Sequence, residues 1–206
     1  MSGVANGLVL LVAASVIAVA LVGDGASSGT GREVAATVAL APPEARAAQP
    51  APMPPVTMSR SVPVRVAIPA IGVDSDLMDL GLQPDRTIEV PPGGFPAGWY
   101  TGAPTPGELG PAIILGHVDW QGPGVFHDLH LLRPDDQVTV SRADGSAAVF
   151  RVTAVEQYPK DSFPTDTVYG NTDHAGLRLI TCGGVLNPQT GSHDDNIVVF
   201  AELLAP

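Results

Sequence analysis

Short apolar runs, each closed within a few residues by glycine, proline or aspartate, fill the chain from about residue 62 onward. Glycine and proline number 23 and 21 among 206 residues, about a fifth of the chain. This spacing leaves little room for helices of ordinary length and favours short strands joined by turns. A helical bundle is therefore disfavoured, and a hydrophobic content of 45% argues against a wholly disordered chain.

The apolar runs predict eight strands. Residues 149–155 alternate between two differently composed faces, and Ala-Asp-Gly at 143–145 is a hairpin-turn signal. One or two helical turns are expected at Phe126–Leu132. Eight short strands at this spacing predict a mainly β (all-β) fold, a closed or nearly closed barrel. The expected strands are Val64–Ile68, Asp76–Leu80, Thr87–Val90, Ala112–Gly116, Gln137–Ser141, Ala148–Glu156, Leu177–Thr181 and Asn196–Leu204.

The first 23 residues carry no charged side chain, and Gly7–Gly23 is almost wholly apolar. As a helix, twenty residues ending at Gly23 would rise about 30 Å, one hydrocarbon thickness. A cleaved signal peptide is the alternative, but no basic residue precedes the segment and no clear small-x-small cleavage site follows it. We therefore expect residues 1–23 to be an uncleaved single-pass anchor in the cell membrane, with the rest of the chain extracytoplasmic.

Residues 24–61 have the composition of a linker. Ala41–Pro55 contains six prolines and five alanines and almost no large apolar residue. Such a stretch cannot bury a core and tends to extended polyproline geometry. We expect an Ala/Pro-rich spacer over 24–61 and a globular domain over 62–206.

Charge and cysteine content exclude several function classes. The net charge is −11, and Lys160 is the only lysine, so a nucleic-acid partner is disfavoured because phosphate binding needs basic residues. Cys182 is the only cysteine, which excludes an internal disulfide and a multi-thiolate zinc site. No EF-hand spacing occurs either. We therefore expect neither a metal nor a cofactor.

Cys182 and His117 have matching contexts. Cys182 follows an apolar run and precedes two glycines, and His117 follows Gly116 at the end of another apolar run. Both positions are typical of the end of a strand rather than of a core. A neighbouring imidazole can hold a thiolate as an ion pair and then protonate a leaving amine. The alternative is a buried, inert Cys182, and the sequence alone does not show that the two residues touch.

The residues around both positions resemble the sortase family of Gram-positive bacteria, most closely the actinobacterial class E/F sortases. Leu179-Ile180-Thr181-Cys182 matches the family's Thr-Leu-x-Thr-Cys strand, with Arg178 at the place of its first Thr. The resemblance covers about Val62 to Leu204 and implies an eight-stranded barrel outside the membrane. The supporting segments are Ile68-Pro-Ala-Ile-Gly-Val73, Gly98-Trp-Tyr100, Pro106-Gly107, Gly116-His-Val-Asp119, Gly124-Val-Phe126, Leu177–Gly184 and Asp195-Asn-Ile-Val-Val199.

This resemblance implies a cysteine transpeptidase that acts on secreted proteins bearing a C-terminal sorting signal. The thiolate of Cys182 would cleave the Thr–Gly bond of a Leu-Pro-x-Thr-Gly-like signal, with His117 as acid/base. An amine on a peptidoglycan precursor or a pilin would then take over the acyl group. The family's Arg at the start of the last strand is replaced by Asn196, which can donate a hydrogen bond to an oxyanion but carries no charge.

Arg178 is the other candidate for the missing Arg. Strand alternation puts it on the same face as Cys182 but roughly 13 Å away along the strand, which favours a structural ion pair. Asp119 is a candidate to orient His117, or else a turn residue. His193 is a candidate to border the cleft, whereas His127, His130 and His174 are expected at the surface. Asp161, Asp166 and Asp173 are expected in solvated loops.

Two other functions remain open: a Cys-His hydrolase that uses water in place of the amine, and a catalytically silent anchored β-domain that binds a wall or protein partner. A papain-like protease is disfavoured because its cysteine precedes its histidine in the chain.

Overall fold

A computed structural model of the chain describes residues 55–189 and 191–204. Within these ranges, no helix has the length and apolar character needed to cross a membrane. The expected anchor over 1–23 and the expected linker up to residue 54 lie outside the described residues.

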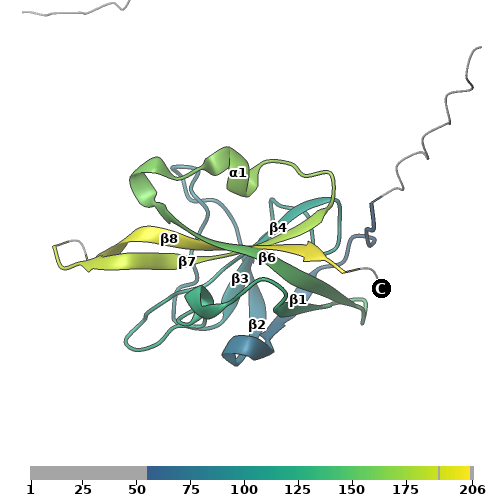
Figure 1. Cartoon of the computed structure of the whole chain (residues 1–206), viewed down its shortest axis with the longest axis horizontal. Helices are drawn as coiled ribbons and strands as arrows, with labels where there is room; N and C mark the ends of the chain where they lie inside the picture. Colours follow the sequence, from purple (N-terminus) through teal and green to yellow (C-terminus); the bar gives the residue numbers. More distant parts are fainter. Residues whose placement is uncertain (1–54, 190, 205–206) are drawn as a thin grey trace, which may run out of the picture. The chain divides into compact units, whose positions relative to one another are not determined.

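Eight strands form a closed barrel in the order β1-β2-β3-β4-β7-β8-β6-β5 (Figure 1). Most of the neighbouring pairs are antiparallel, but β2–β3 and β4–β7 are parallel. The predicted eight-stranded, mainly β barrel is therefore confirmed. The strands are β1 (Pro63–Ile68), β2 (Val73–Leu80), β3 (Ala97–Tyr100), β4 (Gly110–Leu115), β5 (Gln137–Arg142), β6 (Ala147–Pro159), β7 (Ala175–Asn187) and β8 (Ser192–Leu203).

One predicted strand is wrong and one strand was not predicted. Residues 87–90 form no strand, because Ile88 makes only an isolated bridge to Leu82 within a local loop. The barrel closes instead through β3, four residues between proline-rich turns, whose Ala97 pairs with Leu77 on β2. The predicted 143–145 turn is confirmed: the Gly145 amide donates to the Arg142 carbonyl between β5 and β6.

Helical structure within the described ranges is short. The 3-10 turns are η1 (Pro69–Ile71), η2 (Leu129–Leu131) and η3 (Lys160–Ser162), and α1 spans Thr165–Tyr169. η2 lies in the predicted 126–132 segment. Both η3 and α1 belong to the connection from β6 to β7, and Figure 1 shows α1 outside the sheet, where its Val168 is buried.

Apolar residues pack on both sides of β7, and this fixes which way Cys182 faces. Leu177 and Leu179 belong to the cluster that fills the barrel. Ile180 belongs to a second cluster outside it, together with Val168 of α1. Because successive residues of a strand face opposite sides, Cys182 shares the outer face of Ile180, beside the β6–β7 connection.

The packed part of the chain begins before residue 62. Met58 packs against the barrel core, and its amide donates to the Gly107 carbonyl over 2.7 Å. Arg142 is only 3% exposed, and its guanidinium donates to the Ser59 carbonyl. Residues 58–61 are thus part of the folded domain.

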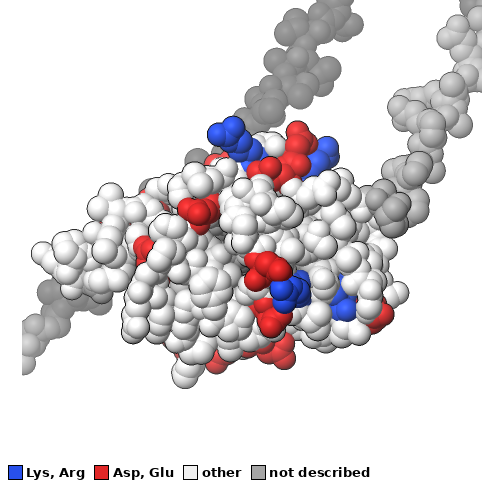
Figure 2. All heavy atoms as spheres, turned by 90° about the horizontal axis from the view of Figure 1, so that it is seen from below, with Lys and Arg blue, Asp and Glu red and all other residues white. Residues whose placement is uncertain are grey.

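Charged side chains are scattered over the surface in small groups. Figure 2 shows more acidic than basic side chains on one face, with most of that face uncharged. Several arginines of the described residues are held in ion pairs, as Arg65 is by Asp74 and Asp76 at 2.6 and 2.8 Å. No continuous basic surface is available on that face to bind a polyanion.

Candidate active site

Cys182 lies on β7 opposite Asn196 of β8. Its thiol is free and half-buried. The strand does not end at the two following glycines, as the sequence suggested, but continues to Asn187 with an irregular register after Gly183. A Cβ on Gly183 would lie 2.6 Å from the Ile197 side chain, so glycine here allows β8 to approach closely beside the thiol.

His117 is brought to the same end of the sheet by the parallel pairing of β4 with β7. Leu115 is the register partner of Ile180, so His117 and Cys182 each lie two residues beyond that pair. Neighbouring strands are about 4.8 Å apart, so their ends are close. The two side chains line one cavity but form no hydrogen bond with each other in this structure.

The imidazole of His117 is held from two sides. Its Nε2–H donates to the Pro91 carbonyl over 2.7 Å, and the Trp120 ring lies 5.0 Å away between centroids. Because a carbonyl oxygen only accepts hydrogen bonds, Nε2 carries the proton and Nδ1 remains able to take up another. His117 is therefore held in a fixed orientation in which Nδ1 can accept a proton.

The cavity has a volume of about 350 Å³. Residues of the β2–β3 loop, including Ile88 and Pro91, face β7 and β8 across it. The polar residues that line it are Gln83, Thr87, His117, Lys160, Tyr169, Thr181, Cys182 and Asn196. A concave site with apolar walls and a few convergent polar groups is typical of a binding or catalytic site.

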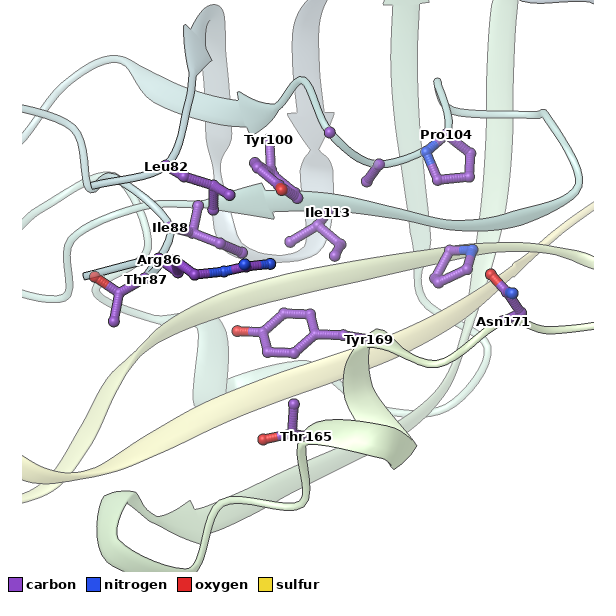
Figure 3. A pocket seen from close by; sticks show the side chains of 13 residues that line it. Leu82, Arg86, Thr87, Ile88, Tyr100, Pro104, Ile113, Thr165, Tyr169 and Asn171 are labelled. Atoms are coloured by element: carbon purple, nitrogen blue, oxygen red, sulfur yellow. The ribbon is translucent and has the colours of Figure 1, made fainter. Parts of the chain in front are cut away.

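A second cavity, of about 580 Å³, adjoins the first and shares Thr87, Ile88 and Tyr169 with it. Figure 3 shows Tyr169 of α1 across this space from Ile113 and Tyr100, with the Arg86 side chain reaching between them. Burial raises the pKa of Tyr169, so its hydroxyl stays protonated at neutral pH. Together the two cavities offer an extended segment a path that leads to Cys182.

Arg178 does not line either of these cavities. Its guanidinium stacks over the Phe200 ring at 4.5 Å and donates to the Leu177 carbonyl. Burial lowers its pKa, although the nearby Glu202 opposes that shift. The expected structural ion pair is wrong, because Arg178 pairs with no carboxylate in the described part of the chain and has an aromatic partner instead.

Asp119 contacts two histidines other than His117. It lies 3.0 Å from His127 Nδ1 and 3.4 Å from His193 Nε2. The suggestion that it orients His117 is therefore wrong. The Val118 carbonyl first, and then the Asp119 carboxylate, raise the pKa of His127. His193 also bonds the Gly184 carbonyl next to the thiol strand, so it lies near the site but does not line its cavity.

The remaining acidic and histidine side chains match their expected settings only in part, because Asp161 lies in η3 and Asp166 in α1 rather than in loops. His127, His130, Asp161, Asp166 and Asp173 are exposed and His174 is half-buried. No group of three or more His, Cys, Asp or Glu residues in the described ranges is arranged to hold a metal ion.

Lys160 also belongs to the site, although no motif in the sequence marks it. Its Nζ lies 3.6 Å from Cys182 Sγ, 3.0 Å from Ser192 Oγ and 2.6 Å from the His193 carbonyl. It comes from η3, directly after β6. The one signal in the sequence was its uniqueness, since no other lysine occurs in the chain.

Comparison with known proteins agrees with this architecture. A family model described as a sortase domain matches residues 66–204. Among solved structures, a lid mutant of sortase A from Corynebacterium diphtheriae is similar at 18% identity and a TM-score of 0.53, over 71% of this chain and 72% of the other. A search of curated proteins gives no match.

Two structures from Actinomyces oris are also similar. For its SrtA sortase the identity is 26% and the TM-score 0.53, over 73% of this chain and 86% of the other. For its sortase C-1 the identity is 22% and the TM-score 0.53, over 69% and 72%. At these identities, the likeness to sortase A and sortase C-1 concerns the fold.

Proposed function

The chain belongs to the sortase family, and from this premise we propose that it is a cysteine transpeptidase in which Cys182 is the nucleophile and His117 the acid/base. The observation that carries the proposal is the parallel register of β4 and β7, which puts His117 and Cys182 each two residues beyond the pair Leu115 and Ile180. They line a single cavity there.

The chemistry follows from these two groups. His117 takes the proton of the Cys182 thiol, and the thiolate attacks the carbonyl carbon of the scissile amide. The tetrahedral intermediate collapses, the C–N bond breaks, and the imidazolium gives its proton to the departing amine. A thioester remains on Cys182. An incoming amine then loses a proton to His117, attacks the thioester and regenerates the thiol.

The substrate we propose is the C-terminal sorting signal of a secreted protein, of Leu-Pro-x-Thr-Gly type. The two adjoining cavities support a peptide substrate, since their walls are largely apolar and lead along α1 to the thiol. The acceptor would be an amine on a peptidoglycan precursor or a pilin. Placement among the class E/F sortases rests on the sequence motifs around His117 and Cys182.

The location we propose is the outer side of the cell membrane. The uncharged segment 7–23 would anchor the chain, and the proline-rich stretch after it would hold the barrel away from the lipid surface. An enzyme placed there meets exported substrates as they emerge.

The test is mass spectrometry of the protein mixed with a library of sorting-signal peptides. We expect a thioester adduct on Cys182, released as an amide when an amine such as triglycine is added. Cys182→Ala is the matched control and should form no adduct. An adduct released only to water, whatever amine is added, would indicate a hydrolase. No adduct with any peptide would contradict the proposal.

A further inference from the structure

We propose that the ammonium group of Lys160 is a third catalytic group, which stabilises first the Cys182 thiolate and then the oxyanion of the tetrahedral intermediate. This assignment rests on the proposed function, because it gives Lys160 a role in the same reaction. It begins from the contact of 3.6 Å between Lys160 Nζ and Cys182 Sγ, which joins the only lysine and the only cysteine of the chain.

The strand register explains how Lys160 reaches the thiol. Asp195 of β8 pairs with Pro159 on one side and with Gly183 on the other. Pro159, Asp195 and Gly183 therefore form one row across three strands. Lys160 is the first residue after β6, and Cys182 precedes Gly183. The lysine side chain consequently has to cross only β8 to meet the sulfur.

The hydrogen bonds of Lys160 aim its charge at the sulfur. The hydroxyl of Ser192 and the carbonyl of His193 accept from Nζ at 3.0 and 2.6 Å. An ammonium has three N–H donors, and the third is directed to Cys182 Sγ at 3.6 Å. The neutral oxygens thus hold the ammonium in place without cancelling its charge.

Carboxylates surround this lysine but do not pair with it. Asp161, Asp194 and Asp195 line a surface hollow together with Lys160, yet none of them forms an ion pair with it in the described ranges. Asp195 instead accepts a hydrogen bond from Gln157 over 2.5 Å. The chain has a net charge of −11. A lysine that served only to solvate the surface would be expected to pair with one of these carboxylates rather than with a thiol.

Neither of the other two candidates can bring a positive charge to the thiol. Asn196 lines the cavity opposite Cys182 but carries no charge. Arg178 is charged but stacks over Phe200, away from the cavity. Among the residues that line the cavity at Cys182, Lys160 is the only Lys or Arg.

The charge acts at two stages. While the thiol is ionised, the ammonium stabilises the thiolate electrostatically. When the thiolate adds to the carbonyl carbon, a C–S bond forms and the π electrons move to oxygen, which becomes the new anion beside the sulfur. A donor already held next to that sulfur stabilises this charge without rearranging. The electrons return as the C–N bond breaks, and the proton of the leaving amine comes from His117.

The test compares alkylation of Cys182 in the full chain by iodoacetate, which is anionic, and by iodoacetamide, which is neutral. Their rate ratio reports the local charge, because the thiolate fraction affects both reagents equally. In Lys160→Met we expect the ratio to fall about fivefold, the factor for one charge at roughly 4 Å in a water-like dielectric. Lys160→Arg should keep the ratio. Arg151→Met removes one exposed charge that pairs with Asp135 at 3.6 Å, and should also keep it. An unchanged ratio in Lys160→Met overturns the proposal.

Chemical modification of the folded wild-type protein covers the case in which Lys160→Met does not fold. Acetylation removes the charge of the only lysine, whereas reductive dimethylation keeps it. We expect the ratio to fall only after acetylation, and equal ratios would overturn the proposal. Neither measurement needs a substrate, so both test Lys160 even if no sorting peptide is cleaved and the proposed function fails.

With an active peptide substrate, Lys160→Met should lower kcat by about 10²-fold with a much smaller change in KM, as expected for a lost oxyanion donor. Lys160→Arg should recover most of that loss because it keeps the charge. A purely structural role for Lys160 would lower the melting temperature without this separation of kcat from KM, and that outcome would overturn the proposal.

Discussion

Cys182 and Asn196 are register partners across β7 and β8, and both line the cavity that His117 also borders. Side chains directly opposite in such a pair lie about 5 Å apart at Cβ. The Asn196 amide is therefore close enough to the sulfur to meet an oxyanion that forms on an attached carbonyl group.

We predict that Asn196→Ala lowers kcat more than it raises KM. An amide that bonds the oxyanion acts only in the transition state, and loss of one such donor costs about 10²–10³ in rate. Steady-state kinetics with a cleaved sorting peptide would measure this. A rise in KM at constant kcat would instead make Asn196 an ordinary substrate contact.

Arg178→Ala should behave in the opposite way. Arg178 is 5% exposed and its guanidinium stacks over Phe200, so its loss should destabilise the sheet by about 1–2 kcal/mol. We expect a lower melting temperature and a near-normal kcat. Arg178→Lys should recover only part of the stability, because a lysine has no planar group to stack. A large kcat defect in a stable Arg178→Ala protein would instead indicate that Arg178 takes part in catalysis.

Substitutions of Cys182 and His117 should differ in how strongly they reduce activity. Cys182→Ala should abolish thioester formation, because no other thiol exists in the chain. His117→Ala should lower transpeptidation by at least about 10²-fold, the usual scale for loss of an acid/base group. Circular dichroism should be unchanged in both variants. If His117→Ala kept near-normal turnover, His193 would become the candidate base.

The strand pattern could be predicted because the barrel interior imposes it. Alternation on Ala148–Glu156 and the apolar run at Leu177–Thr181 reflect faces that pack against the core, and both segments lie within strands. The strand at Ala97–Tyr100 was not predicted, since four residues between proline-rich turns show no period. The false strand at Thr87–Val90 has a suitable composition, but it pairs with no neighbouring strand.

The candidate site was predictable only where each residue carried its own local signal. His117 and Cys182 each follow an apolar run and lie next to glycine, which marked both as candidates, although only His117 follows the end of its strand and Cys182 lies within β7. Lys160 lies 22 positions before Cys182, and only the register of β6, β8 and β7 brings them together. The stacking of Arg178 on Phe200 likewise depends on a cross-strand pair.

Glu108 should stabilise the folded domain by an amount that depends on pH. Burial disfavours its charged form, but hydrogen bonds from the Thr105 amide and hydroxyl, both 2.7 Å, outweigh that effect and lower its pKa. A lowered folded-state pKa stabilises the protein above the ordinary value of about 4.5, and the gain is lost as the pH falls through the folded value.

We therefore predict that Glu108→Gln lowers stability by about 1 kcal/mol at neutral pH. This is less than the full contribution of hydrogen bonds to a charged group, because the glutamine oxygen replaces part of them. The difference from wild type should shrink as the pH falls below about 4.5 and through the lowered folded-state pKa, because the carboxyl is protonated first in the unfolded and then in the folded protein. Urea melts at several pH values would measure it. A difference independent of pH would mean that only the shape of the side chain matters.

The last prediction concerns where the folded domain begins. Arg142 is almost fully buried and donates to the Ser59 carbonyl, and Met58 packs against the core. A chain that starts at residue 55 keeps both contacts, whereas one that starts at residue 62 removes them. We expect the shorter chain to lose about 3 kcal/mol, from a hydrogen bond to a charged group and the apolar contact of Met58. For a domain of this size that corresponds to roughly 10 °C in Tm.

In the longer chain, Met58→Ala should cause a smaller part of the loss, which separates the apolar contact from the Arg142 bond. Equal melting temperatures for the two truncated chains would show that residues 55–61 lie on the barrel without stabilising it.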